Sequence, residues 1–311
     1  MTQHPLTTPA ARTAIEGAVS EHLGRGWHID HTTDLAERSS HAAMILSGEG
    51  LAVFAKLANR PDAQEQVSAE LAGLDLIGTL AGVAVPQTVR SGLVDFPGGG
   101  SVLLFEALVE RVPEERTRAD WESIGRTLAR LHSVRGEQFG LDQNGFFGPL
   151  PQDNSPVPGG TWADFYRERR VLPWLATAAD AGSVDKVAVE RVERLLDRLA
   201  DLAGPEPQPA LLHGDAQHHN FVSTPAGAVV IDPSPYFGHP ELDLALLDYF
   251  TPVPDATFSA YAEVQPIAAD FPERRELWRV FAYLAILTVD AASDFGRSFS
   301  ARLTAALDRY V

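Results

Sequence analysis

The sequence lacks cysteine, which excludes a fold held together by disulfides. It also lacks a long apolar run. The longest, at 280–289, lies between Arg279 and Asp290 and is too short to span a bilayer. The opening residues MTQHPLTTPA show neither the basic segment nor the apolar segment of a secretory signal. Together these absences predict a cytoplasmic protein without a membrane segment.

Basic residues are far fewer than acidic residues. The 311 residues include 25 basic and 42 acidic side chains, so the formal net charge is −17. Nucleic acids and anionic membrane surfaces both require a basic patch on the protein that binds them. The composition therefore predicts no nucleic-acid partner and no membrane partner, and it favours cationic ligands.

Lysine is almost absent. The chain has two lysines, Lys56 and Lys186, and arginine carries the rest of the basic charge. A compact ammonium and a planar guanidinium cannot fill the same pocket, so a retained lysine is a candidate for a specific role. Lys56 lies in a strand-like segment, 51–57, with alternating apolar residues. The alternative is an ordinary lysine at a strand end that reaches solvent.

Glu70 lies inside the apolar stripe of the helix expected after Lys56. The stripe consists of Val67, Leu71, Leu74 and Gly78. A carboxylate that faces a core needs a cation, and Lys56 is the natural partner. A solvated position at the edge of the stripe is the alternative.

The sequence pattern changes near residue 110 from mixed to mostly helical. Before that point, strands are expected near 42–46, 51–57, 85–91 and 101–106, and helices near 9–23 and 62–80. After it, helices are expected near 119–133, 162–178, 183–202, 240–250 and 272–289. This order predicts a small mixed lobe joined to a larger helical lobe.

The densest group of polar residues lies between His213 and Asp243. Asp215 and Asn220 share one loop, and Asp232 follows a hairpin at 221–231, so local geometry brings the three close together. In phosphoryl transfer one carboxylate accepts the proton of the attacking hydroxyl, while another carboxylate and an amide oxygen hold Mg²⁺. The spacing H-x-D-x-x-x-x-N with a later Asp has the form of a protein-kinase catalytic loop.

Further motifs extend this pattern along the chain. They are FAK at 54–56, ELAGL at 70–74, LARLH at 128–132, FGLD at 139–142, LLHGD at 211–215, IDP at 231–233 and YFGHPELDLA at 236–245. On these motifs the chain resembles the fructosamine kinase (ketosamine-3-kinase) family, within the aminoglycoside phosphotransferase and protein-kinase-like superfamily. The resemblance covers about residues 50–310, and the last motif separates the family from aminoglycoside kinases.

The resemblance implies an α+β, protein-kinase-like fold. A small antiparallel-sheet lobe with one key helix, residues 1–108, would bind nucleotide, and a larger, mostly helical lobe, residues 109–311, would carry catalytic and substrate-binding residues. The implied enzyme uses ATP and Mg²⁺ to phosphorylate the 3-hydroxyl of ketosamines, either free amino sugars or glycated protein amines. This is a protein-deglycation activity.

The resemblance also implies roles for single residues. Asp215 would be the catalytic base, Asn220 and Asp232 the magnesium ligands, and Lys56, oriented by Glu70, the ligand of the α- and β-phosphates. The backbone near Glu106 and Leu108 would contact adenine. His213, His239, Glu241 and Asp243 would contact substrate or support the catalytic loop, with Asp243 as a brace.

Two segments depart from the family pattern. The expected phosphate-covering turn, 35–43, has no glycine, and Ser39, Ser40 and His41 are the residues that could contact the phosphates instead. After Asp215 the chain has Gln217 and two histidines at 218–219, where relatives commonly have an aromatic and small residues. We expect substrate specificity to be affected there.

Three other interpretations are open. The first is an aminoglycoside kinase or another small-molecule phosphotransferase. The second is a kinase-fold protein that binds without catalysis. The third is a metallohydrolase with a transition-metal site built from His213, Asp215, His218, His219, Asp232 and His239. The third leaves Lys56, Glu70 and Asn220 without a role.

Overall fold

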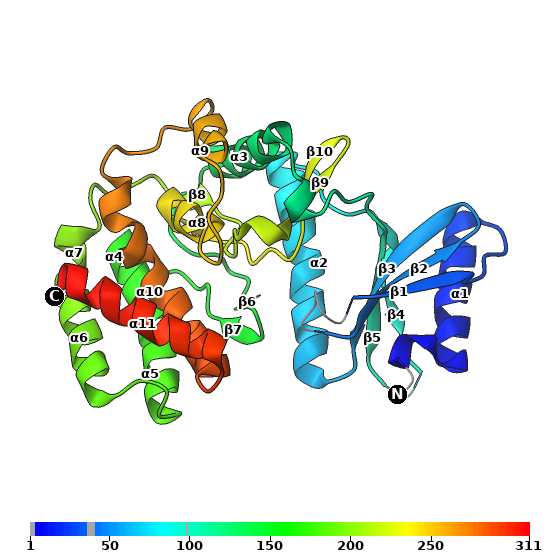
Figure 1. Ribbon diagram of the computed structural model, residues 1–311, viewed down its shortest axis with the longest axis horizontal. Helices are drawn as coiled ribbons and strands as arrows, with labels where there is room; N and C mark the ends of the chain where they lie inside the picture. Colours follow the sequence, from blue (N-terminus) through cyan, green and yellow to red (C-terminus); the bar gives the residue numbers. More distant parts are fainter. Residues whose placement is uncertain (1–3, 36–40, 98) are drawn as a thin grey trace.

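The computed structural model describes residues 4–35, 41–97 and 99–311. Its first part is an antiparallel sheet in the order β1-β2-β3-β5-β4. The strands are β1 (His31–Asp34), β2 (Ala43–Gly48), β3 (Leu51–Ala58), β4 (Thr88–Asp95) and β5 (Ser101–Glu106). Helix α1 (Pro9–Leu23) lies on the outer side of this sheet, and helix α2 (Pro61–Ala81) lies between the sheet and the rest of the molecule (Figure 1).

The two faces of the sheet follow from the alternation along β5. Val102 and Leu104 join the apolar cluster that includes Ile15 of α1, whereas Leu103 joins the cluster that includes Val67 of α2. Lys56 is the cross-strand neighbour of Leu103, and such neighbours share a face. The register therefore puts Lys56 on the α2 side, facing the second lobe.

Helix α2 lies close to the segment that follows Asp232. A Cβ atom on Gly73 would come within 2.9 Å of Cδ of Pro235 and 3.3 Å of the carbonyl oxygen of Pro233. Gln66 donates a hydrogen bond to the carbonyl oxygen of Gly148 at 2.7 Å. These contacts fix α2, and with it Glu70, against the second lobe.

The second lobe is mostly helical. Its helices are α3 (Arg118–Ser133), α4 (Trp162–Tyr166), α5 (Leu172–Asp180), α6 (Lys186–Asp197), α7 (Leu199–Leu202), α8 (Pro240–Leu247), α9 (Asp255–Ala262), α10 (Phe271–Asp290) and α11 (Asp294–Tyr310). Its short strand pairs are β6 (Gly145–Phe147) with β7 (Leu150–Gln152), β8 (Ala210–Leu211) with β11 (Phe237–Gly238), and β9 (Phe221–Thr224) with β10 (Gly227–Val230). Among the described residues, no helix is both long and apolar enough to cross a membrane.

Two predicted helices are interrupted. The helix expected at 162–178 has a π-helical turn, Arg167–Val171, between α4 and α5. Pro173 has no N–H to bond the carbonyl of Arg169, and the guanidinium of Arg170 donates to that carbonyl at 2.9 Å instead. The helix expected at 183–202 is divided at Arg198 into α6 and α7. It also begins later than expected, because Asp185 caps α6 by accepting a hydrogen bond from the backbone N–H of Ala188 at 2.7 Å.

Several elements were not predicted, among them the short strands β6, β7 and β11, the edge strand β1, and the helices α9 and α11. All four residues of β1 are exposed, so the strand carries no apolar alternation to reveal it. Helix α11 is amphipathic, is capped by Ser293 and buries Phe299 and Leu303. The sequence signal for this helix was present and was missed.

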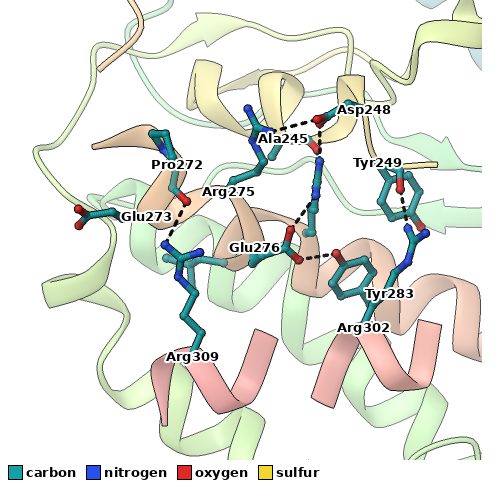
Figure 2. Close-up of polar contacts among 12 residues, drawn as sticks. Ala245, Asp248, Tyr249, Pro272, Glu273, Arg275, Glu276, Tyr283, Arg302 and Arg309 are labelled. Atoms are coloured by element: carbon teal, nitrogen blue, oxygen red, sulfur yellow. Dashed lines mark hydrogen bonds and ion pairs between the residues drawn. The ribbon is translucent and has the colours of Figure 1, made fainter. Parts of the chain in front are cut away.

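An ionic network holds the end of α8 against α10. Asp248, directly after α8, pairs with Arg275 at 3.0 Å and with Arg279, both on α10 (Figure 2). Glu276 accepts a hydrogen bond from the hydroxyl of Tyr283 at 2.6 Å and also pairs with Arg279. The network fixes α8, whose first turn carries Asp243, relative to the helices behind it.

Candidate active site

Residues from both lobes meet at Lys56. Its Nζ atom lies 2.6 Å from Oε2 of Glu70 on α2 and 3.0 Å from Oδ1 of Asp232 in the second lobe. Lys56 and Glu70 are both buried. The contact expected from the apolar stripe on α2 is therefore present, and Asp232 is a second carboxylate on the same ammonium.

The charges of Lys56, Glu70 and Asp232 shift one another's pKa values. Burial alone lowers the pKa of Lys56, but the carboxylates of Asp232 and Glu70 outweigh it and raise that pKa. Partial desolvation by the surrounding protein would by itself raise the pKa of the Asp232 carboxyl, but the Lys56 ammonium outweighs this effect and lowers that pKa to about 2. Burial also raises the pKa of Glu70. Lys56 and Asp232 are therefore both ionised at neutral pH.

Asp215 and Asn220 are in contact on one loop. The side-chain amide of Asn220 donates to the carbonyl oxygen of Asp215 at 2.8 Å and to its Oδ2 atom at 3.1 Å. Burial raises the pKa of the Asp215 carboxyl to about 7. The backbone N–H of Ile231 donates to the carbonyl oxygen of Asn220 at 3.0 Å, so this loop is tied to the hairpin that ends at Asp232.

Asp232 has an unusual backbone conformation. Its φ angle is 47°, in the left-handed region that residues other than glycine seldom adopt, although aspartate tolerates it better than most. Such a conformation persists only where the surroundings impose it, and it is concentrated at functional sites. Here Asp232 lies just after strand β10, and its side chain contacts Lys56.

Asp243 supports the loop that carries Asp215. It is fully buried at the start of α8 and accepts hydrogen bonds from the backbone N–H groups of His213 at 2.6 Å and Gly214 at 3.1 Å. His132 on α3 contacts the same carboxylate at 3.1 Å. Asp243 thus lies where a brace of the loop would lie.

His213 is also part of the loop scaffold. Its Nδ1 atom accepts a hydrogen bond from the backbone N–H of Asp215 at 3.2 Å, so Nε2 carries the proton and donates to the carbonyl oxygen of Ile231 at 3.1 Å. Burial lowers the pKa of His213, which keeps the ring neutral. Nδ1 therefore fixes the backbone of the loop at Asp215, and Nε2 holds the loop to the end of the hairpin.

Gly214 is required for this loop geometry. Its φ angle is 83°, and a Cβ atom there would lie 1.9 Å from the carbonyl oxygen of Ser234. We expect Gly214→Ala to lower the free energy of unfolding by about 3 kcal/mol, because backbone strain and the clash add. Gly182, with φ 70° and open space around it, is the matched control, and Gly182→Ala should cost about 1 kcal/mol. Equal losses in denaturant titrations would contradict a tight approach at Gly214.

His239 and Glu241 are occupied by structural contacts. His239 caps α8 by accepting a hydrogen bond from the backbone N–H of Glu241 at 3.1 Å, and burial lowers its pKa to about 4. Glu241 accepts two hydrogen bonds from Arg274, one of them from Nε at 2.9 Å, and one from the indole of Trp278 at 2.8 Å. Of the two roles predicted for them, support of the loop and its helix is the one that these contacts favour.

The predicted adenine segment follows β5. The side chain of Glu106 contacts His22 of α1 at 3.4 Å, so it is directed toward α1. The backbone N–H of Ala107 donates to the carbonyl oxygen of Ala52 at 2.8 Å, and Leu108 is partly buried. Ser39 and Ser40, the predicted phosphate contacts, lie outside the described residues.

The transition-metal interpretation gains no support. Within the described ranges, no group of three or more His, Asp or Glu side chains is placed to hold one metal ion. The proposed ligands are engaged elsewhere: His213 holds the hairpin, and His218 contacts Thr251 at 2.7 Å and Arg116 at 3.1 Å.

The sequence analysis missed two residues that hold the loop. His132, for which the sequence predicted no role, contacts Asp243 and the hydroxyl of Tyr261 at 2.7 Å. Arg116 donates to the carbonyl oxygens of His218 at 3.1 Å and Phe221 at 2.5 Å. The position of His132 in LARLH was a signal for the first, whereas no local pattern marks Arg116.

Comparison with known proteins adds an independent line of observation. The model of the fructosamine kinase family matches residues 11–310. A probable ketoamine kinase of Escherichia coli (strain K12) is 31% identical over 274 residues, covering 87% of this chain and 91% of the relative. The ketosamine-3-kinase of Mus musculus is 29% identical, covering 75% of this chain and 81% of the relative.

Solved structures agree with the sequence comparison. A putative fructosamine-3-kinase from Thermobifida fusca superposes with a TM-score of 0.79 at 32% identity, covering 96% of this chain and 98% of that one. A thermostable mutant of the aminoglycoside phosphotransferase APH(4)-Ia superposes with a TM-score of 0.63 at 15% identity, covering 94% of this chain and 98% of that one. The second likeness concerns the fold alone, and it confirms the predicted two-lobe, kinase-like α+β architecture.

Proposed function

Because this chain belongs to the fructosamine kinase family, we propose that it transfers the γ-phosphoryl group of ATP to the 3-hydroxyl of a ketosamine. The observation that carries the proposal is the meeting of Lys56 and Glu70 from the first lobe with Asp232, Asn220 and Asp215 from the second. These are the residue types that phosphoryl transfer requires.

Each residue has a defined task in this reaction. Asp215 accepts the proton of the attacking hydroxyl, and the partly buried position raises its pKa to about 7, within the range useful for a general base. Lys56 binds the α- and β-phosphates while Glu70 holds its ammonium in place. Asp243 and His213 keep the loop that carries Asp215 rigid.

The residues at the site fit a magnesium ion. Asp232 offers an ionised carboxylate whose side chain is 46% exposed. The amide nitrogen of Asn220 is directed to Asp215, and no hydrogen bond within the described ranges reaches its Oδ1 atom. One carboxylate and one amide oxygen, completed by phosphate and water, make a set that suits Mg²⁺. When bound there with ATP, Mg²⁺ would neutralise negative charge on the transferred group.

We assign residues 1–108 to nucleotide binding and residues 109–311 to catalysis and substrate binding. In this assignment adenine contacts the backbone near Glu106 and Leu108, and Ser39 and Ser40 contact the phosphates. Free amino sugars and glycated protein amines are the two proposed forms of the substrate. The net charge of −17 favours a substrate that carries an amine.

The test is a Mg-ATP-coupled assay with two panels of acceptors. We expect ketosamines of the fructosamine, ribulosamine and erythrulosamine types to give a kcat/KM at least about tenfold above that of kanamycin-type aminoglycosides, and added EDTA to stop transfer. Identification of the phosphorylated hydroxyl then decides the position of transfer. Efficient phosphorylation of aminoglycosides without turnover of ketosamines would replace the proposal with an aminoglycoside kinase, and nucleotide binding without any turnover would indicate a binding protein.

A further inference from the structure

The two carboxylate oxygens of Asp215 have different surroundings. Oδ2 accepts hydrogen bonds from two side-chain amides, that of Asn220 at 3.1 Å and that of Gln217 at 3.4 Å. Among the described residues, none donates a hydrogen bond to Oδ1. One oxygen is therefore held, and the other is available.

The backbone of this loop is fixed independently of these amides. Asp243 holds the N–H groups of His213 and Gly214, and His213 holds the N–H of Asp215. These backbone contacts do not fix the rotation of the Asp215 carboxylate about its Cβ–Cγ bond. The amides of Asn220 and Gln217 supply that restraint.

We propose, on the basis of the proposed function, that Gln217 is a positioning residue that joins Asn220 in holding Oδ2 of Asp215 and so presents Oδ1 to the substrate hydroxyl. In the transfer step the hydroxyl O–H bond breaks and its proton goes to Oδ1. The hydroxyl oxygen forms a bond to the γ-phosphorus. The bond from that phosphorus to the bridging oxygen breaks, and ADP leaves with the electron pair.

Gln217 is the informative member of the pair. Asn220 also has the proposed magnesium role, so its replacement would change two things at once. Gln217 is half-buried, and within the described ranges its side chain makes one hydrogen bond, which goes to Asp215. The bond opposes the effect of burial on the Asp215 carboxyl, because an amide donor favours the ionised form.

The test compares Gln217→Met, which keeps the length of the side chain and removes the donor, with the wild type. We expect kcat for the ketosamine to fall about tenfold, while the KM values for ketosamine and ATP and the calorimetric Kd for ATP stay within about twofold, because misorientation of a base affects the reacting geometry and leaves binding intact. Gln217→Glu, which cannot donate and adds negative charge beside Asp215, should lose at least as much.

Gln265→Met is the matched control, since Gln265 bonds Arg135 and Ser133 away from the loop. It should leave kcat unchanged. A crystal structure of Gln217→Met should show the Asp215 carboxylate rotated from its wild-type orientation. An unchanged kcat, an unchanged orientation, or a rise in the ketosamine KM alone would overturn the proposal, and the last would make Gln217 a substrate contact.

Failure of the proposed function gives a different result. In that case the wild type turns over no ketosamine, before any variant is made. The same variants are then compared on the acceptor that the wild type does phosphorylate, or on the slow hydrolysis of ATP by water. A kcat that Gln217→Met leaves unchanged there overturns the positioning role as well.

Discussion

Asp215→Asn should lower kcat by about 10²–10⁴-fold while ATP binding stays nearly intact. The amide has almost the same shape as the carboxylate, and Asn220 and Gln217 can still donate to its oxygen. On the proposed mechanism, the variant loses the group that accepts the hydroxyl proton. The measurements are steady-state kinetics with the best ketosamine of the panel and calorimetry with ATP.

The stability of this variant provides a check on folding. Burial raises the pKa of the Asp215 carboxyl to about 7, so its ionised form is costly to bury above that pH. The variant should therefore unfold at no lower temperature than the wild type at pH 8. Asp201→Asn, at an exposed aspartate of α7, is the control and should keep full activity. A kcat of Asp215→Asn within threefold of the wild type would remove Asp215 from the mechanism.

Lys56→Arg should lose activity almost as severely as Lys56→Met, with kcat/KM at least about 10²-fold lower in both. The Nζ atom of Lys56 lies 2.6 Å from Glu70 and 3.0 Å from Asp232 in a buried position. A guanidinium is planar and wider than an ammonium, so it cannot keep both contacts and also reach the phosphates that Lys56 is proposed to bind. Retaining the positive charge in Lys56→Arg should therefore not restore activity.

The sequence offers an ideal control in its other lysine. The side chain of Lys186 is 90% exposed at the start of α6, so Lys186→Arg and Lys186→Met should behave as the wild type. Calorimetry with ATP separates nucleotide affinity from turnover in all four variants. Near-normal activity of Lys56→Arg would instead make Lys56 an ordinary charge at the end of a strand.

The candidate site was predictable where its signals are local. Scarcity of lysine singled out Lys56, and helical spacing put Glu70 in an apolar stripe, so their contact could be expected before any coordinates. Asp215, Asn220 and Asp232 lie on one loop and one hairpin, whose geometry depends on a few neighbouring residues. Short-range periodicity and turn chemistry specify such features directly.

Other features depend on contacts between distant segments. His132 reaches Asp243 across 111 positions, and Lys56 reaches Asp232 across 176. Strand β1 has no apolar alternation of its own, so its place in the sheet depends on pairing with β2. The break between α4 and α5 also depends on a side-chain contact. The guanidinium of Arg170 donates to the carbonyl oxygen of Arg169, which Pro173 cannot bond.

The sequence by itself therefore determined the two-lobe architecture and the grouping of Asp215, Asn220 and Asp232, because both are encoded in periodicity and motif spacing. Only the tertiary structure decided that Glu70 contacts Lys56 and not solvent, that Glu106 turns toward α1, and that Gln217 and Asn220 share one oxygen of Asp215. A single chain carries no record of which distant polar groups pair. Burial in the packed core selects those partners, since a buried polar group without a partner destabilises the fold.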